Sequence, residues 1–545
     1  MAAPKTRISV VLIYGLLLAG SALFSLPFMW MVATSLKVDR ELFTEHLHIL
    51  PMAPLPVQHS PYIDLRQFRD LTGPRQKESL AILRDELSKN TAAFRLEGSS
   101  EAAANTIYRN LVRTSPATFW DSADLDRNLR AAADATAPTD ATFPALREFG
   151  LGSLHLLGRH GQELETPAEP WSVSAPGATV EFAKSADSTF PGDAVHYDFH
   201  QSKRIVLWKN LTAPFAADEF FGVRISILPD DSWHRLTVYV KSGDRWYRAR
   251  RVFSLAYTSA AAVQSTWQLK SADDDSSRIK SWLVLDPVKE PPADLKQLAG
   301  QNGLSLFLAM DRSNALQAWW GKITRNYLLT FTNLPFWRYF ATSVFITTIN
   351  ILFSIVSCSL VAFAFSRLTW AGRDTLFAIM LATMMVPAQV TMIPQFMIYK
   401  ALGWYNTLTP LWIGAMFANA FFVFLMRQFM KAIPRDLEDA ARIDGCGFWG
   451  LYWRIILPLV RPALATIAIF TFLASWNDFM TPLIYLNDER LYTLSLGLFS
   501  FRVQIGTSDQ ALLMAGCFLM LVPVILIFFF AQRYFIQGVT LTGIK

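Results

Sequence analysis

The distribution of apolar residues divides this chain into three stretches. Residues 1–37 and about 335–545 are dominated by Leu, Ile, Phe, Met and Val, whereas residues 38–334 have the charges, Pro and Gly of an ordinary soluble domain. The 545 residues are 52% hydrophobic and only 17% charged, averages that conceal this division. The pattern predicts two or more structural units, one of which lies in a membrane.

Six apolar segments are each long enough to cross a bilayer, because a membrane-spanning helix takes about 20 mostly apolar residues. They are roughly 9–35, 340–365, 375–399, 406–429, 463–486 and 511–531. The first follows Lys5 and Arg7, as a signal peptide would. Its apolar run is about twice that of a signal peptide, and no clear small-residue cleavage site follows it, so we expect an uncleaved anchor.

Basic residues predict how these segments are oriented, since cytoplasmic connections are enriched in Lys and Arg. With the N-terminus inside, the cytoplasmic side carries twelve basic residues and the short outer loops carry three. The twelve are Lys5, Arg7, Arg367, Arg373, Arg427, Lys431, Arg435, Arg442, Arg454, Arg461, Arg533 and Lys545, and the three are Lys400, Arg490 and Arg502. We therefore expect both termini in the cytoplasm and the long polar stretch outside.

Composition also excludes some classes of protein. The pI of about 9.1 reflects basic residues beside apolar segments, not a basic tract or stripe, so nucleic acid is not an expected partner. The three cysteines, Cys358, Cys446 and Cys517, all lie in the apolar parts, so we expect no disulfide framework in the polar stretch. No GxxxxGK[ST] sequence occurs, so any ATP is hydrolysed by another subunit.

A charged segment interrupts the apolar half. Residues 439–458 read DAARIDGCGFWGLYWRIILP, on the side predicted to be cytoplasmic. Pro434 suits the first turn of a helix, acidic residues follow it, and Gly445 and Gly447 end it. Periodicity alone leaves two readings: a connector at the membrane surface, or a short helix that binds another protein.

The residues themselves resemble the EAA loop, which marks permease subunits of bacterial ABC importers. The resemblance combines a short motif with Pro458 thirteen residues after Gly445, and it departs from the usual pattern at Asp439 and Cys446. It implies that the loop, residues 434–458, forms a coupling helix that docks in a groove of an ATPase subunit. The implied coupling residues are Glu438, Asp439, Ala440, Ala441, Asp444, Gly445 and Pro458.

Other stretches resemble carbohydrate-importer permeases of the maltose type. They are residues 27–37, 384–387, 475–482 and 531–543. The resemblance covers about 1–37 and 325–545 and implies a six-helix type I ABC importer permease in the bacterial inner membrane. It also implies a homologous second permease, two ATP-binding subunits, an extracytoplasmic solute-binding protein and a sugar substrate. Catalytic residues, metal and cofactor are then not expected in this chain, since the partner uses ATP and Mg.

Some polar residues within the spans are candidates for the substrate path, because a polar group in a membrane span is costly unless it faces a cavity or a partner. Trp476 adjoins Asn477 and Asp478 and offers an apolar face on which a sugar can stack. The alternative is that the three form an interfacial anchor or bond helices together. Gln389 and Gln395 are similar candidates, and the Pro residues at 387 and 394 predict a bend beside them.

The stretch 38–325 is an insertion relative to this family, between a first helix at 1–37 and a permease core at 326–545. Its pattern is helical from about 61 to 160 and strand-like from about 177 to 312, which predicts an antiparallel sandwich or jelly roll. It contains Trp208, Trp233, Trp246, Trp267 and Trp282, which suit either a sugar-stacking platform or a core.

Two polar features of the insertion were considered as sites. Alternation along a strand places His196, Asp198 and His200 on one face, either as metal ligands or, more commonly, as a solvated face opposite Tyr197 and Phe199. Acidic pairs such as Asp230 and Asp231 occur in turn-like sequences and do not indicate a hydrolase. The main hypothesis is thus an importer permease, and the alternative is a membrane-tethered protein whose outer domain processes or senses glycan.

Overall fold

A computed structural model describes most of the chain. The described residues are 7–42, 49–54, 56–63, 75–89, 104–105, 107–108, 111, 124–135, 146–166, 170–185, 190–212, 215–256, 262–270, 282–300, 303–505 and 510–540. They form two compact units. We call the first, chiefly Met1–Ser35 and Asn326–Lys545, the membrane unit, and the second, Leu36–Asp274 and Ser281–Arg325, the outer unit.

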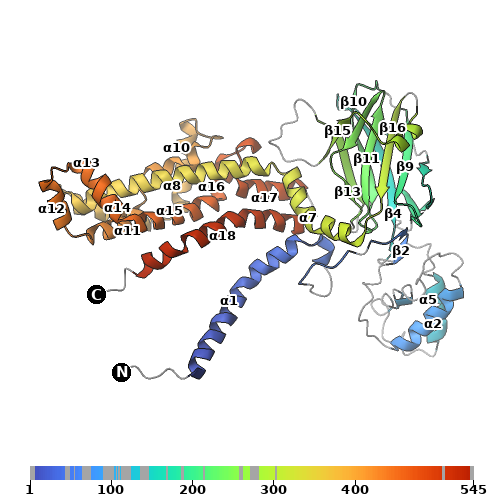
Figure 1. The fold of residues 1–545 in the computed structure, drawn as a ribbon, viewed down its shortest axis with the longest axis horizontal. Helices are drawn as coiled ribbons and strands as arrows, with labels where there is room; N and C mark the ends of the chain where they lie inside the picture. The colour runs from blue at the N-terminus through green and yellow to red at the C-terminus, as the bar shows by residue number, and fades with distance from the viewer. Residues whose placement is uncertain are drawn as a thin grey trace. The chain divides into compact units, whose positions relative to one another are not determined.

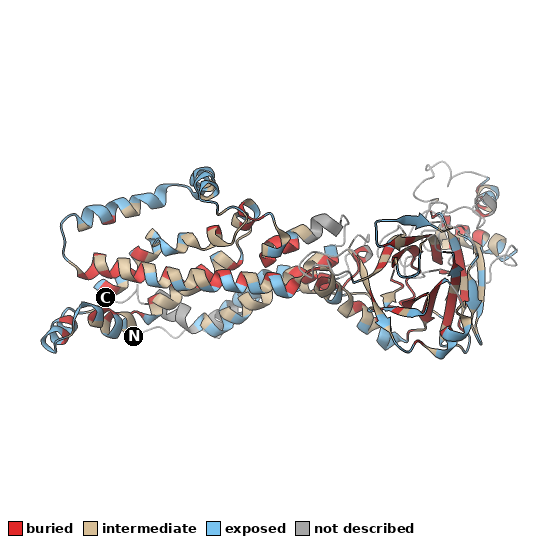
Figure 2. Cartoon of the chain, turned by 90° about the horizontal axis from the view of Figure 1, so that it is seen from above, coloured by how far each residue is buried: buried red, intermediate tan, exposed pale blue. Residues whose placement is uncertain are grey.

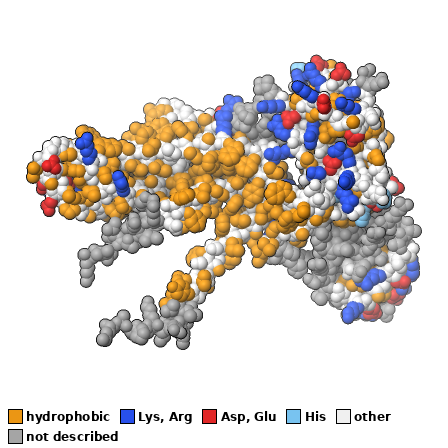
Figure 3. All heavy atoms as spheres, viewed as in Figure 1, with side chains coloured by type: hydrophobic (Ala, Val, Ile, Leu, Met, Phe, Trp, Pro, Cys, Tyr) orange, Lys and Arg blue, Asp and Glu red, His pale blue; other side chains and the backbone are white. Residues whose placement is uncertain are grey.

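The membrane unit is made of helices, several of them long and apolar. Within the described residues, four helical stretches are long and apolar enough to cross a membrane: Ile13–Ser35, Phe336–Arg367, Ile413–Lys431 and Gln510–Gln532. Two bent helix pairs bring the number to six if each pair is one span, so the six-span topology stays a prediction. Hydrophobic side chains cover much of this unit's surface, as expected for a chain surrounded by lipid (Figure 3).

Helix α8 is the central element of the membrane unit. The principal helices are α1 (Arg7–Ser35), α8 (Phe336–Arg367), α9 (Arg373–Ala382), α10 (Ala388–Ala401), α11 (Ala420–Lys431), α15 (Arg461–Trp476), α16 (Met480–Tyr485), α17 (Leu494–Ile505) and α18 (Gln510–Thr540). Helix α8 packs against α11 and α15, and α1 packs against α18 (Figure 1). Helix α7 (Ala315–Asn333) precedes α8 in the chain.

Three of the predicted apolar segments are not continuous helices. The segment 406–429 contains two turns of 3-10 helix, Thr409–Leu411 and Ile413–Met416, before α11, and two others are sharply broken. Helices α9 and α10 meet at an angle of 99° where Pro387, which lacks an N–H, follows a turn of 3-10 helix. The segment 463–486 is interrupted between α15 and α16, where Asp478 Oδ1 accepts a hydrogen bond from Thr481 N, 3.1 Å away. Apolar composition alone therefore predicted the segments but not their breaks.

The outer unit is mainly one fourteen-stranded sheet. The strands are β1 (His59–Ser60), β4 (Phe149–Gly158), β5 (Glu163–Glu165), β6 (Ser172–Ser174), β7 (Thr179–Lys184), β8 (Asp193–Asp198), β9 (Arg204–Leu211), β10 (Phe220–Leu228), β11 (Arg235–Ser242), β12 (Arg245–Ala249), β13 (Phe253–Ser254), β14 (Val263–Leu269), β15 (Leu283–Val288) and β16 (Leu304–Asp311). The order along its main path is β1-β8-β4-β10-β14-β15-β12-β11-β16-β9-β6. Strands β2 (Tyr62–Ile63) and β3 (Leu146–Arg147) form a separate pair.

The large sheet encloses one apolar core. Inward residues alternate along the strands, as the period of two requires, and the core cluster draws from both flanks of the sheet: Phe149 on β4, Val223 on β10, Val238 on β11 and Leu306 on β16. The only parallel pairing among the described strands is that of β14 with β15. The inward faces of its strands are buried (Figure 2), and the predicted sandwich or jelly roll stays a prediction.

The strands begin earlier in the chain than the pattern indicated. Helices α2 (Gln76–Lys89) and α5 (Leu125–Ala135) lie within the range expected to be helical, but β3 and β4 lie there too. The sequence of β4, FGLGSLHLLG, alternates about an apolar face, and glycines weaken that signal. Glycine is needed at position 150 because a Cβ there would lie 2.6 Å from the Phe190 ring.

Candidate functional site

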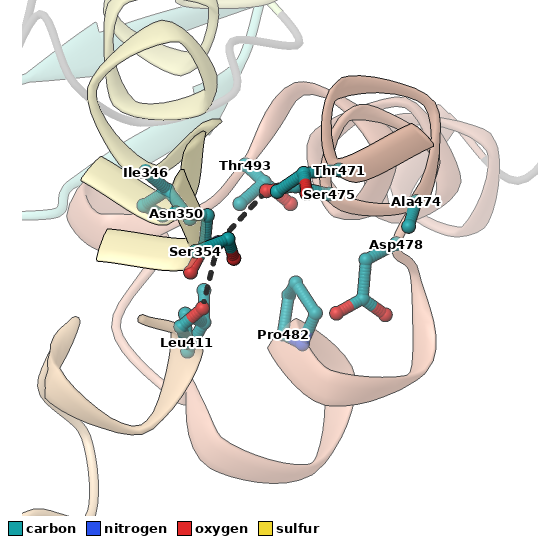
Figure 4. A pocket seen from close by; sticks show the side chains of 10 residues that line it. All are labelled: Ile346, Asn350, Ser354, Leu411, Thr471, Ala474, Ser475, Asp478, Pro482 and Thr493. Atoms are coloured by element: carbon teal, nitrogen blue, oxygen red, sulfur yellow. Dashed lines mark hydrogen bonds between the residues drawn. The ribbon is translucent and has the colours of Figure 1, made fainter. Parts of the chain in front are cut away.

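A small cavity in the membrane unit lies among α8, α15 and the chain that follows α15. It has a volume of about 210 Å³ and is lined by Ile346, Asn350, Ser354, Leu411, Thr471, Ala474, Ser475, Asp478, Pro482 and Thr493 (Figure 4). Small-molecule sites usually measure about 300–1,000 Å³. In this conformation of the single chain, the cavity is therefore too small to enclose an oligosaccharide.

Asn350 ties the walls of this cavity together. Its Nδ2 donates to Ser475 Oγ at 2.9 Å, which links α8 to α15, and to the carbonyl oxygen of Leu411 at 3.1 Å (Figure 4). Thr347 Oγ1, on the same helix, lies 3.4 Å from Ser475 Oγ. Hydrogen-bonding groups in a membrane span are commonly placed at helix interfaces or cavities. The side chains of Asn350, Thr347 and Ser475 lie at the interface of α8 and α15, and those of Asn350 and Ser475 also line the cavity.

Asp478 also lines the cavity, at the break that follows α15. Its carboxylate accepts from Thr481 N, and its carbonyl oxygen accepts from Ser495 Oγ at 2.7 Å. Asn477 turns away to its own helix, donating to the carbonyl oxygen of Leu473 at 2.9 Å. Asp478 therefore caps a helix and presents a carboxyl group to the cavity.

The remaining residues predicted for the substrate path lie elsewhere. Trp476 is 3% exposed, its ring stacks on Phe472 with centroids 5.6 Å apart, and its Nε1 donates to the carbonyl oxygen of Met520 at 3.0 Å. The Trp476 ring thus packs against neighbouring helices, as in the alternative interpretation, and its place in the substrate path stays a prediction. Gln389 and Gln395 lie on the exposed surface of α10, outside the cavity lining.

Sequence reasoning missed most of the cavity. Asn350 and Ser354 lie four residues apart within an apolar span, a spacing that places both on one helix face. That signal was available. The partner of Asn350, Ser475, was not identifiable, because it is 125 residues away in the chain.

The charged segment forms a short helix, α12 (Asp436–Ile443), whose first turn holds three acidic residues. Gly445 ends it with a φ of +79°, a left-handed conformation that glycine adopts without a steric penalty. Ala441 is buried against residues of α8 and α11, whereas the Ile443 side chain is 86% exposed. Asp439, Ala440, Asp444 and Gly445 are exposed as well.

The residues after α12 are held against α8. They form α13 (Phe448–Gly450), a π-helical stretch at Leu451–Ile456 and α14 (Leu457–Leu459), which contains the half-buried Pro458. The Tyr452 hydroxyl lies 2.7 Å from Ser359 Oγ of α8. Trp449 and Trp453 are exposed beside it. These residues thus present an apolar outer surface, while Tyr452 attaches their inner face to α8.

In the outer unit, the loop before β11 holds a buried polar cluster. Tyr197 Oη donates to Asp230 Oδ2 at 2.5 Å, and Tyr62 Oη donates to the Asp230 carbonyl oxygen at 2.5 Å. Burial raises the pKa of the Asp230 carboxyl, and burial together with that carboxyl raises the pKa of Tyr197. Burial also lowers the pKa of His234 to about 4. Asp230 is fully buried.

The predicted histidine face is not continuous. Strand β8 ends at Asp198, and His200 has a φ of +40° in the turn beyond it, so it leaves the strand's alternation. Asp198 Oδ1 instead accepts from His200 N at 2.9 Å. Tyr197 and Phe199 are buried, as the alternation predicted. Over the part of the chain that the structure describes, no group of three or more His, Cys, Asp or Glu side chains could hold a metal.

Most of the tryptophans in the outer unit pack against other buried side chains. Trp267 is fully buried and Trp233 is 2% exposed. Trp246 stacks on Phe307 with centroids 5.4 Å apart. Both Trp246 and Trp208 pack against a buried cluster that contains Phe307. Trp282 is half-buried. Trp267 therefore belongs to the core of the large sheet, and Trp233 belongs to a separate small cluster with Val38, Ala256 and Ala318.

Part of the chain, including most of its membrane unit, matches known proteins. The model of the family "Binding-protein-dependent transport system inner membrane component" matches residues 302–541. The arabinooligosaccharides transport system permease protein AraQ of Halalkalibacterium halodurans is 36% identical over 221 residues, 40% of this chain and 78% of that protein. The probable ABC transporter permease protein YurM of Bacillus subtilis is 29% identical over 328 residues, 59% of this chain and 96% of that protein.

A solved bacterial ABC transporter involved in the import of the acidic polysaccharide alginate is also similar. It is 26% identical and covers 38% of this chain and 79% of its own, with a TM-score of 0.36, too low to compare sites. The assignment rests on the sequence relatives, of which AraQ is matched over more than two thirds of its length. The chain belongs to the family of binding-protein-dependent transport system inner membrane components, as a permease of a carbohydrate ABC importer.

Proposed function

We propose that this permease works by alternating access, driven by ATP hydrolysis in separate subunits and coupled to them through α12. The observation that carries the proposal is the two-sided character of that helix. Ala441 and Glu438 are buried against the membrane unit, while Ile443 and Leu437 are 86% and 47% exposed. An isoleucine this exposed at the end of an acidic helix suits insertion into a groove on another protein.

The partner proposed for α9 and α10 is a second, homologous permease. Helix α10 has no buried residue, and its apolar side chains are widely exposed, with Val390, Ile393 and Met397 each at 66%. Lipid covers part of such a surface, and a second permease lining the path covers the rest. A partner at this face would also bring Gln389 and Gln395 to the path.

The complete importer in this proposal contains two ATP-binding subunits and an extracytoplasmic solute-binding protein. The family description supports binding-protein dependence. Both termini lie in the cytoplasm, and the outer unit lies outside, in the periplasm, as the distribution of basic residues predicts. ATP and Mg are bound by the ATP-binding subunits, and this chain contributes the path and the coupling helix.

Reconstitution of the complete importer tests the proposal. The chain would be co-purified with its partner subunits, placed in liposomes, and supplied with arabino-oligosaccharides, lactose and oligogalacturonides together with the solute-binding protein. We expect ATP-dependent accumulation of one glycan class and stimulation of ATP hydrolysis by the loaded binding protein. Cleavage of a glycan by the purified chain, with no ATP-dependent uptake, would instead establish the membrane-tethered enzyme.

A further inference from the structure

A buried ion pair connects the coupling helix to the end of α8. Arg367 Nη1 lies 2.6 Å from Glu438 Oε1, and the two side chains are 3% and 6% exposed. Arg367 Nη2 also donates to the carbonyl oxygens of Met430 and Ile433, the latter at 2.9 Å. One guanidinium group therefore joins α8, the end of α11 and α12.

Packing alone does not explain this pair. Its neighbours are apolar, including Phe363, Met430 and Ala441 of one buried cluster. Removing two charges from water is costly, and apolar residues of similar volume often replace a buried ion pair without loss of stability. Arg, however, offers several donors in fixed directions, so the same guanidinium can donate to two carbonyl groups while its charge stays beside a carboxylate. The pair specifies position more than it contributes stability.

Helix α8 carries this position to the cavity. Arg367 is its last residue, and Asn350 and Ser354 line the cavity on the same helix. The distance along the helix from residue 367 to residue 350 is about 25 Å at 1.5 Å per residue. Asn350 is in turn bonded to Ser475 of α15. A displacement of α12 that moves Glu438 would therefore shift one wall of the cavity relative to the other.

We propose that Arg367 is a positioning residue that transmits the movement of α12 to α8 and so to the cavity. The inference rests on the proposed coupling through α12 and adds the residue through which that movement enters the spans. The nearby pair of Arg373 and Asp374 offers a matched control. Its atoms are 3.0 Å apart, but the side chains are 25% and 73% exposed, and α12 does not take part in it.

The test uses the complete importer in nanodiscs and a reporter cysteine in the cavity, Ser354→Cys. Cys446 and Cys517 would be replaced by Ser, and the buried Cys358 retained. The labelling rate of the reporter by biotin-maleimide is measured without nucleotide and after trapping with ATP and vanadate. The ratio of the two rates reports how far ATPase closure reaches the cavity, and basal ATP hydrolysis is measured in parallel.

We expect Arg367→Gln to bring this ratio at least about fivefold closer to one, so that the reporter responds less to vanadate trapping, while ATP is still hydrolysed. A change of this size corresponds to the loss of a coupling free energy of ordinary magnitude. Arg373→Gln should leave the ratio unchanged, and the double variant Arg367→Glu with Glu438→Arg should restore much of it. If the single variant fails to assemble, the double variant and Arg367→Lys, which keeps the charge, decide the question.

Four results are distinguishable. A ratio in Arg367→Gln equal to that of the parent reporter overturns the inference, as does a charge-exchanged complex that assembles and hydrolyses ATP but shows no recovery. A parent complex whose reporter does not respond to vanadate refutes the proposed coupling itself, before Arg367 is at issue. Loss of ATP hydrolysis in proportion to the loss of labelling response indicates a merely structural role and also overturns the inference.

Discussion

Replacing Ile443 by Ala tests whether α12 docks on an ATP-binding subunit. The side chain is 86% exposed at the last residue of α12, so its loss removes little that stabilises this chain. Ala is also the better helix former, and the fold should be retained. Any loss of binding then reports on contact with a partner.

The magnitude follows from the apolar area available at that position. The substitution removes three carbons, each worth about 0.8 kcal/mol when buried. Weighted by the 86% that is exposed, complete burial in a groove gives about 2 kcal/mol. We therefore expect the dissociation constant for the ATP-binding subunit to rise about 30-fold.

The assay is a titration of the permease pair, held in nanodiscs, with the purified ATP-binding subunit. Met385→Ala is the matched control, because Met385 is 85% exposed but lies at the break between α9 and α10. Its dissociation constant should not change. A value for Ile443→Ala within twofold of the parent would refute docking through this end of α12, as would an equal loss in Met385→Ala.

Three other substitutions test the two units separately. Asn350→Leu removes the hydrogen bond to Ser475 and should destabilise the membrane unit by about 1 kcal/mol, measured by thermal denaturation of the complex. Tyr197→Phe removes the donor to Asp230 Oδ2, while Ser232 N still donates to Oδ1, and should destabilise the outer unit by about 1–3 kcal/mol, measured by hydrogen exchange of its strands. The folded pKa of His234, about 4, lies below its ordinary 6.5, so the unfolded state binds its proton first and stability is lost as the pH falls through that window. The difference in stability between the parent and His234→Gln should thus decrease by about 2 kcal/mol from pH 7 to pH 5. Asp230, with its raised pKa, has the opposite pH dependence, but it is present in both proteins and cancels in this difference.

Local sequence patterns predicted the elements that depend on local chemistry. Apolar length located the four long apolar helices and the two bent helix pairs, and alternation predicted the burial of Tyr197 in β8 and of Phe199 just beyond it. The bend at Pro387 followed from the missing N–H of proline. The break after Trp476 did not, because the apolar composition continues across it while a new helix begins at Met480, where Asp478 accepts from Thr481 N.

Contacts between distant segments decided what the sequence left open. Glu438 and Asp439 are both acidic and adjacent, yet one is buried against Arg367 and the other is exposed. Successive residues on a helix differ by about 100° in direction, so only the packing of α12 determines which one faces inward. The resemblance grouped them as coupling residues, whereas the structure gives them opposite surroundings.

The two ends of the insertion show how a permease can accept so large a domain between its first two long helices. In the membrane unit, Asn326 Nδ2 donates to the carbonyl oxygen of Ser35 at 2.9 Å, and the Tyr327 hydroxyl lies 2.7 Å from Ser35 Oγ. In the outer unit, Lys322 and Glu41 form an ion pair whose side chains are 2% and 0% exposed. Each unit thus has its own contacts between the chain that leads into the insertion and the chain that leads out of it. Because the cost of closing a loop grows only slowly with its length, the membrane unit needs the same contacts at Ser35 whether the intervening segment is short or spans residues 38–325.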